Sequence, residues 1–217
     1  MEESGIKILY EGGTGELVEK KSRFIANVRK IENEQEAMDF IAEMKKRYWD
    51  ARHNCYAFVA GENHQLTRCS DDGEPAGTAG RPILDVLLRE DIHNAAVVVT
   101  RYFGGILLGT GGLVRAYQGA AQKGLAASVI AVKKKGRILS IKTDYNGIGK
   151  LQYILTKNGI TLLNSDYGEA VELTACVPVD RLEHLKAEIT EGSNGRADIT
   201  QGEIKEFAVI DGEVAFL

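Results

Sequence analysis

The stretch from Ala95 to Ser128 constrains the fold more than any other part of the chain. It begins with the apolar, β-branched run Ala95–Val99, which predicts a strand buried on both faces. It ends with apolar and small residues at helical spacing, namely Leu113, Ala116, Tyr117, Ala120, Gly124 and Leu125. Between these segments lie five glycines within nine positions, namely Gly104, Gly105, Gly109, Gly111 and Gly112. We therefore expect a strand, a glycine loop and a helix in direct succession.

Two readings of this glycine loop are open. So many glycines imply positive φ angles or a very close approach of other backbone, as in a tight connection that lays a helix against a sheet. Alternatively, the flanking Arg101 and Arg115 form an anion site together with the free N–H groups of the helix N-terminus. In that case the guanidiniums pair with phosphates, the glycine N–H groups add hydrogen bonds, and Tyr102 stacks on a base.

The same loop does not match the common nucleotide-binding motifs. It lacks the GK[ST] ending of a P-loop, so the lysine that grips the phosphates is missing. It also departs from GxGxxG, because Val114 stands where the third glycine is needed after Gly109 and Gly111. We expect neither a dinucleotide fold nor a bound cofactor.

Three carboxylates, those of Asp71, Asp72 and Glu74, lie within four residues just before a predicted helix. They could hold Mg²⁺ or Mn²⁺, which prefer oxygen ligands, or act as general acid and base. The sequence D-D-G-E-P is equally typical of a solvated turn. No further ligand can be placed by spacing, so we expect no metal here.

A zinc site or a thiol nucleophile receives little support. His53, Cys55, His64 and Cys69 are the candidate ligands, but no CxxC knuckle accompanies them. A nucleophilic Cys–His pair needs a base within hydrogen-bond reach, which the sequence does not establish. His53 is retained only as a partner of the three carboxylates in an enzyme reading.

Four blocks of the sequence resemble the Impact/YigZ family in content and order. They are KSRFIA (Lys21–Ala26), DARHNCYAF (Asp50–Phe58), SDDGEPAGTAGRPIL (Ser70–Leu84) and TRYFGGILLGTGGLVRAY (Thr100–Tyr117). The resemblance implies an amino-terminal domain like domain IV of elongation factor G and a ferredoxin-like carboxy-terminal domain. It also implies a role in RNA or ribosome binding, or in regulation of translation through a protein partner.

Composition and charge describe an ordinary globular protein. The net charge is −4, but residues 1–136 hold 19 Lys and Arg against 18 Asp and Glu, whereas residues 137–217 hold 8 against 13. A polyanion should therefore meet a local patch on the first part. The three cysteines, Cys55, Cys69 and Cys176, follow no framework spacing. With no signal peptide or membrane span apparent, we expect reduced thiols in a cytoplasmic protein.

The pattern of the chain predicts an α+β protein of two domains, residues 1–134 and residues 138–217. In the first, we expect strands at Ile6–Tyr10, Leu17–Glu19, Ser22–Arg29, Asn54–Ala60 and Leu66–Ser70, and helices at Asn33–Tyr48 and Arg81–Glu90. The basic run Lys45–Arg47 suits the dipole at a helix end better than a binding patch. In the second domain, we expect βαββαβ over Ile138–Thr143, Ile148–Asn158, Ile160–Asp166, Glu169–Val177, Asp180–Glu191 and Ala197–Val209.

These observations favour a binding protein linked to translation. Its expected binding residues are Arg101, Tyr102, Gly104, Gly105, Gly109, Gly111, Gly112 and Arg115. The alternative is a hydrolase or phosphate-handling enzyme that uses Asp71, Asp72 or Glu74 with His53. The sequence does not decide between RNA and protein partners, and it indicates no oligomeric state.

Overall fold

The computed structural model describes residues 5–61 and 63–217, which form two compact units. The amino-terminal unit spans Ile6–Ala131, and Val132–Leu217 forms the body of the carboxy-terminal unit. Both are α+β, with an antiparallel sheet in each. Strand β7 (Val129–Thr143) runs through the division without a break, so the predicted boundary at Lys133–Gly136 lies inside a strand. The division into residues 1–134 and 138–217 remains a prediction.

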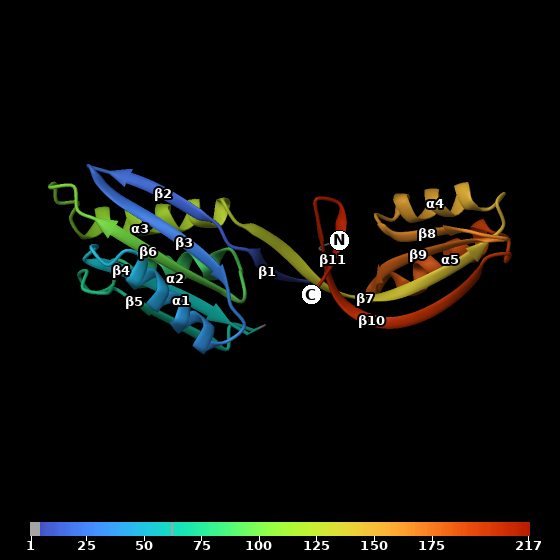
Figure 1. The fold of residues 1–217 in the computed structure, drawn as a ribbon, viewed down its shortest axis with the longest axis horizontal. Coiled ribbons are helices and arrows are strands. Elements are labelled where there is room, and N and C mark those ends of the chain that lie inside the picture. The colour runs from blue at the N-terminus through green and yellow to red at the C-terminus, as the bar shows by residue number, and fades with distance from the viewer. Residues whose placement is uncertain (1–4, 62) are drawn as a thin grey trace. The chain divides into compact units, whose positions relative to one another are not determined.

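The amino-terminal unit is built on a five-stranded antiparallel sheet (Figure 1). Its strand order is β2-β3-β6-β4-β5, with β6 in the centre. These strands span Thr14–Glu19 (β2), Ser22–Lys30 (β3), His53–Ala60 (β4), Leu66–Ser70 (β5) and Ala95–Tyr102 (β6). Strand β1 (Ile6–Glu11) lies beside His93, whose N–H donates to the Lys7 carbonyl.

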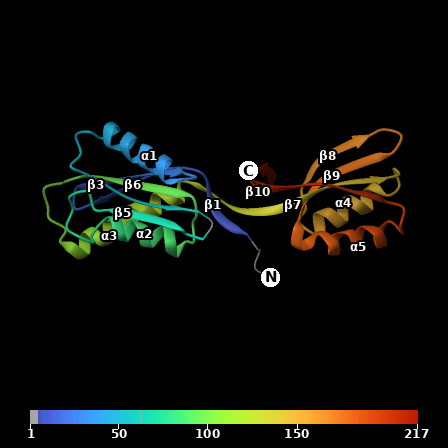
Figure 2. The same ribbon diagram turned by 90° about the horizontal axis from the view of Figure 1, so that it is seen from below.

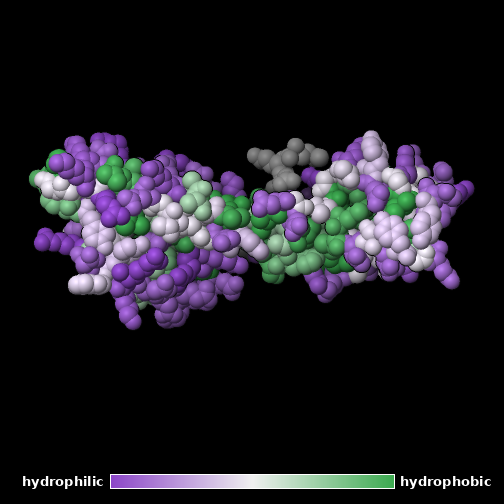
Figure 3. Space-filling model, turned by 45° about the horizontal axis from the view of Figure 1, so that its top comes forward, coloured by the Kyte–Doolittle hydropathy of each residue, from purple (hydrophilic) through white to green (hydrophobic). Residues whose placement is uncertain are grey.

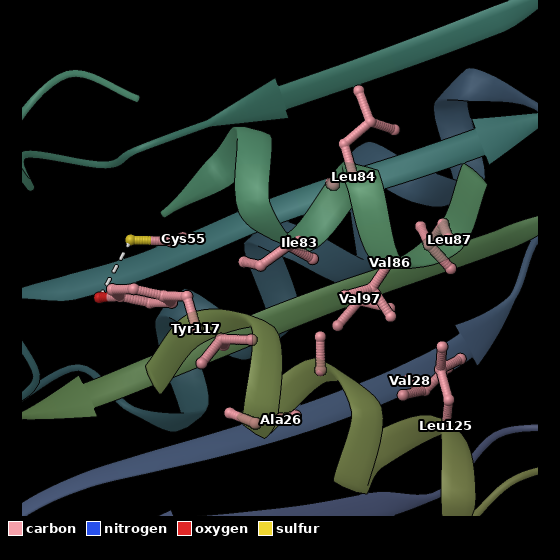
Figure 4. Close-up of a cluster of buried hydrophobic side chains, with 14 of the residues drawn as sticks. Ala26, Val28, Cys55, Ile83, Leu84, Val86, Leu87, Val97, Tyr117 and Leu125 are labelled. Atoms are coloured by element: carbon pink, nitrogen blue, oxygen red, sulfur yellow. Dashed lines mark hydrogen bonds between the residues drawn. The ribbon is translucent and has the colours of Figure 1, made fainter. Parts of the chain in front are cut away.

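Helices cover both faces of this sheet (Figure 2). Helix α1 (Glu34–Arg47) lies on one face, and helices α2 (Gly80–Arg89) and α3 (Thr110–Ala126) lie on the other. Along β6, Val97 and Val99 enter the core beneath α2 and α3, whereas Val98 enters the core beneath α1. The strand is therefore buried on both faces, as its apolar run predicts. Figure 4 shows the α2–α3 side of this packing.

The start of α1 follows its sequence signal. The Asn33 side chain accepts the backbone N–H of Glu36, and the Glu36 carboxylate accepts the backbone N–H of Glu32. This reciprocal pairing satisfies donors that a helix start otherwise leaves open. Phe40, Ile41 and other apolar residues of α1 are buried, as the predicted stripe requires.

The carboxy-terminal unit has the expected βαββαβ order. After β7 come α4 (Ile148–Lys157), β8 (Leu162–Tyr167), β9 (Val171–Pro178), a 3₁₀ turn (Val179–Arg181), α5 (Leu182–Gly192) and β10 (Asp198–Ile210). The sheet order β10-β7-β9-β8, antiparallel throughout, is the split βαβ arrangement. A further strand, β11 (Glu213–Phe216), follows β10 through a turn at Asp211–Gly212 and is absent from the predicted elements. Aspartate followed by glycine is a hairpin signal that could have revealed it.

No helix in the described part of the chain has both the length and the apolar character that crossing a membrane requires.

The carboxy-terminal unit has an apolar core of its own, which predicts that it folds alone. Leu139, Ile141, Leu151, Leu173 and Leu185 all lie in that core. A fragment of residues 132–217 should melt cooperatively, because two-state unfolding is typical of small domains with one core. Circular dichroism during heating measures this. A fragment with a broad, non-cooperative change would contradict the division into two folding units.

Candidate functional site

The pairing of the central strands brings the predicted site residues to one end of the amino-terminal sheet. Arg101 stands opposite His53 of β4 and Phe24 of β3. Because side chains alternate along a strand, Arg101 enters the α2–α3 side that Val99 also faces, and Tyr102 lies on the α1 side. The glycine loop then leaves this end of the sheet toward α3.

Arg101 is held in a buried ion pair. Its Nη1 lies 2.6 Å from Glu74 Oε1, and only 8% of the Arg101 side chain and 3% of the Glu74 side chain are exposed. The same carboxylate oxygen accepts the hydroxyl of Tyr117 at 2.8 Å. The guanidinium also lies 5.5 Å from the ring centres of Phe24 and Phe103. Arg101 is therefore anchored within the fold by charge, hydrogen bonding and aromatic contact.

Cys55 lies next to this ion pair and is a buried thiol. Its Sγ is 2.9 Å from the carbonyl oxygen of Asp71 and 3.4 Å from the hydroxyl oxygen of Tyr117, a contact drawn in Figure 4. Burial raises the pKa of Cys55 to about 12, so the thiolate needed for nucleophilic attack does not form near neutral pH. Cys55 is structural.

The Asp71 carboxylate stabilises the loop before α2 through hydrogen bonds to the backbone. Its carboxylate accepts the backbone N–H groups of Gly77, Ala79 and Gly80 at 2.8–2.9 Å. Burial raises the pKa of Asp71, but the three hydrogen bonds together lower it by more, so the net pKa lies below its ordinary value. Helix α2 has no side-chain cap from its own N-cap residue, so Asp71 supplies the acceptor from a distance.

Asp72 and His53 also form hydrogen bonds within the protein. The Asp72 carboxylate accepts the backbone N–H of Asn54 at 2.7 Å and pairs with Lys45. The backbone carbonyl of Asp72 lies 3.0 Å from His53 Nδ1, which must donate there, since a carbonyl only accepts. All three carboxylates of the D-D-G-E-P loop thus serve local structure. Among the described residues they do not gather into a metal-ligand cluster.

The glycine loop owes part of its composition to close packing. A Cβ at Gly104 would lie 2.0 Å from the backbone carbonyl carbon of Lys21, so no larger residue fits against the β2–β3 turn. Gly105 and Gly109 instead have φ angles of +86° and +72°, which favour glycine. The tight-connection reading accounts for these three glycines. Gly111 and Gly112 form the first turn of α3, which begins without a side-chain cap.

Arg101 and Arg115 line separate clefts. The first, called here the Tyr102 cleft, has a volume of about 460 Å³ and is lined by Asp50, Ala51, Arg52, His53, Arg101, Tyr102, Phe103 and Leu107. The second, called here the Arg115 cleft, has a volume of about 240 Å³ and is lined by Leu17, Glu19, Lys20, Leu108, Gly112, Arg115 and Ala116. The sequence predicts one anion site that Arg101 and Arg115 share, whereas in the structure the two residues line different clefts.

The residues that line the two clefts lie at one end of the unit. This end, called here the loop end, is formed by the β2–β3 turn, the C-terminus of α1, residues 49–53 and the glycine loop (Figure 1, Figure 2). Eight exposed basic residues lie on these segments and the first turns of α3: Lys20, Lys21, Arg23, Lys45, Lys46, Arg47, Arg52 and Arg115. Arg23 pairs with Glu16, and Lys45 pairs with Asp72. The other six form no ion pair within residues 5–61 and 63–217.

Large apolar side chains are exposed at the same end. Trp49 is 83% exposed, Leu107 82% and Phe103 57%. Figure 3 shows hydrophobic and hydrophilic surface side by side there. Trp49, Leu107 and Arg52 lie outside the set of site residues that the sequence predicts. Trp49 offered a signal, because an aromatic residue between Arg47 and Arg52 interrupts a basic stretch just after a predicted helix.

Comparisons with known proteins agree with the four sequence blocks. Residues 20–125 match the model of the Impact N-terminal domain, and residues 141–196 match a domain of unknown function, DUF1949. The IMPACT family member YvyE of Bacillus subtilis is 42% identical over 89% of this chain and 89% of its own length. The IMPACT family member YigZ of Escherichia coli is 36% identical over 81% of this chain and 87% of its own length.

Two further matches extend the comparison. Protein IMPACT of Mus musculus is 35% identical over 43% of this chain, which is 30% of its own length. A crystal structure described as that of an hypothetical protein has 33% identity and a TM-score of 0.58, covering 92% of this chain and 98% of the other.

Replacement of Glu74 by alanine should strongly destabilise the protein. It leaves the Arg101 guanidinium buried without its counter-charge, and removing one partner of a buried pair typically costs about 3–5 kcal/mol. Urea unfolding measures the loss. Glu16→Ala, which breaks the exposed pair with Arg23, is the matched control and should hardly move the midpoint. Equal midpoints for the two variants would contradict the buried pair.

Replacement of Asp71 by asparagine should lower stability in a pH-dependent way. The lowered pKa of Asp71 means that its stabilising effect is present above the ordinary carboxyl pKa, about 3.9, and is lost as the pH falls through the folded-state pKa. The free energies of unfolding of the two proteins should therefore differ at pH 7 and converge toward pH 2. A difference that stays constant over this range would contradict the assigned hydrogen bonds.

Proposed function

Since the chain belongs to the IMPACT family, we propose that it is a binding protein of translation that contacts RNA, on the ribosome, through the loop end of its amino-terminal unit. The link to translation comes from the family resemblance of the four sequence blocks. The choice of RNA comes from the chemistry of the loop end. The carboxy-terminal unit, which carries the negative charge of the chain, lies outside this contact in the proposal.

The observation that carries the proposal is the presence, at one end of the unit, of exposed rings beside cations that form no ion pair with any other described residue. Lys20, Lys21 and Arg52 offer charges to phosphates, while Trp49 and Phe103 offer faces on which bases stack. Exposed tryptophan is costly to leave in water, so its presence beside cations favours a partner with both negative charge and flat apolar faces. Single-stranded RNA has both.

The Tyr102 cleft suits an unstacked base. Its walls combine the rings of Tyr102, Phe103 and His53 with the apolar side chain of Leu107, and Arg52 lines it as well. The Tyr102 hydroxyl donates a hydrogen bond to the Asp50 carboxylate at 2.7 Å. Chiefly because of this hydrogen bond, the pKa of Tyr102 is raised and the phenol stays protonated. The Arg115 cleft adds Lys20 and Arg115 nearby for backbone phosphates.

The enzyme alternative has weaker support in this arrangement. It requires Asp71, Asp72 or Glu74 to exchange protons with a substrate. Each of these carboxylates already accepts donors from the protein, and Glu74 is buried against Arg101. His53 lines the Tyr102 cleft, but its Nδ1 donates a hydrogen bond to the backbone carbonyl of Asp72. A binding function accounts for the exposed cations and rings of the loop end, whereas catalysis would have to use carboxylates that already accept hydrogen bonds from the protein.

Trp49 provides a direct test, because it is the single tryptophan of the chain. Titration with a mixed-sequence single-stranded RNA should quench its fluorescence, since a stacked base contacts the indole ring. With three or four phosphate contacts, the slope of log K against log salt should be roughly −2 to −3. Quenching with no salt dependence would point to a non-phosphate partner and contradict the proposal.

Charge variants then place the contact on the molecule. Replacing Lys20, Lys21 and Arg52 together by alanine should weaken RNA binding by about tenfold or more for each lost contact and flatten the salt slope. The matched control replaces three lysines of the carboxy-terminal helices, Lys150, Lys157 and Lys186, which changes the net charge equally. If the control weakened binding as much as the loop-end variant, binding would be unspecific and the assigned interface would be wrong.

A further inference from the structure

A second cluster of chemically active side chains lies at the opposite end of the same sheet. Strand β4 ends at Ala60 and β6 begins at Ala95, and the segments beyond them bring His64 close to Asp91 and His93. The ligand atoms of these three residues all lie within 4.8 Å of one another. This is the one such cluster of histidine, cysteine and carboxylate groups among the described residues.

We propose that His64, Asp91 and His93 form a binding site for a divalent transition-metal ion, Zn²⁺ being the best match. Two imidazoles and one carboxylate are a ligand set that Zn²⁺ uses, with water in the fourth position. The site would join the connection between β4 and β5 to the turn that precedes β6. It lies apart from the loop end and does not depend on RNA binding.

The distances from the Asp91 carboxylate to the two histidine nitrogens are close to those around a tetrahedral ion. Ligands at about 2.0–2.1 Å from Zn²⁺ are separated from each other by roughly 3.3–3.4 Å. Asp91 Oδ1 lies 3.3 Å from His93 Nε2 and 3.6 Å from His64 Nε2. The 66% exposure of the Asp91 side chain leaves the cluster open to ions from solution.

Each histidine has a feature that favours binding. His93 Nδ1 lies 3.1 Å from the Gly61 carbonyl and donates to it, which fixes the ring with Nε2 as the free ligand atom. His64 Nε2 is buried and has no hydrogen-bond partner among the described residues, a state that a bound ion would satisfy.

The rings must adjust on binding. They are stacked, with centroids 4.0 Å apart and planes 8° from parallel, so lone pairs that lie in the two ring planes do not converge on one ion. A shared ion needs the His64 ring to turn toward Asp91. His93 is held by backbone pairing with β1 and by the Gly61 carbonyl, so the adjustment falls to His64.

Metal titration of the full chain tests this site. After treatment with EDTA and its removal, calorimetry with ZnCl₂ should show one ion per chain, and the melting temperature should rise, because an ion that binds only the folded state stabilises it. CoCl₂ should give the visible absorption bands of a tetrahedral Co²⁺ site. His64→Gln and Asp91→Asn should each weaken Zn²⁺ binding by about tenfold or more while keeping the fold.

Two controls separate this site from surface binding. His184 lies 3.7 Å from Glu188 on the exposed face of α5, so His184→Gln removes a histidine–carboxylate pair that lies outside the cluster. His53→Gln tests the histidine of the Tyr102 cleft. Both should leave the affinity for Zn²⁺ unchanged. Absence of one-to-one binding to the wild-type chain, or equal affinity in the His64 and Asp91 variants, would overturn the proposal.

Discussion

The buried ion pair between Arg101 and Glu74 is the interaction on which the architecture of the amino-terminal unit depends. It joins the end of the central strand to a loop 27 residues earlier, and Tyr117 connects the same carboxylate to α3. A guanidinium in this position would be very unfavourable alone, so the loop must close over it. Asp71 then holds the following backbone at the start of α2. The carboxylates of the D-D-G-E-P loop therefore stabilise the fold, and the exposed surface at this end is formed by other residues.

The side chains that face outward at the same end of the sheet are different ones. Once Arg101 is anchored inward, alternation along β6 places Tyr102 on the opposite face, and the glycine loop carries Phe103 and Leu107 into solvent. Gly104 lets this loop lie directly on the β2–β3 turn, which brings Lys21 beside it. One set of residues thus holds the end of the sheet together, and a second set leaves cations and rings exposed to solvent.

The sequence predicted most of the fold, because the relevant signals are local. The apolar run of β6, the Asn33 cap and the alternation after Ile138 each arise within a few residues, and the structure has the corresponding elements. The partners of the site residues could not be predicted, since Arg101–Glu74 and His64–His93 are contacts between distant segments. Arg101 and Arg115 flank the same loop, yet a strand and a helix direct them into different clefts. The basic character of the loop end could not be predicted from the net charge of residues 1–136, which is near zero because acidic residues elsewhere offset the lysines and arginines of the loop end.

Ultraviolet cross-linking of the protein to ribosomes, followed by mass spectrometry of the cross-linked peptides, tests the central claim most directly. The account predicts RNA cross-links at Trp49, Tyr102 or Phe103, because rings stacked on bases react efficiently. Cross-links confined to the carboxy-terminal unit, or association with ribosomes through ribosomal proteins alone, would contradict the assignment of the loop end as an RNA-binding surface.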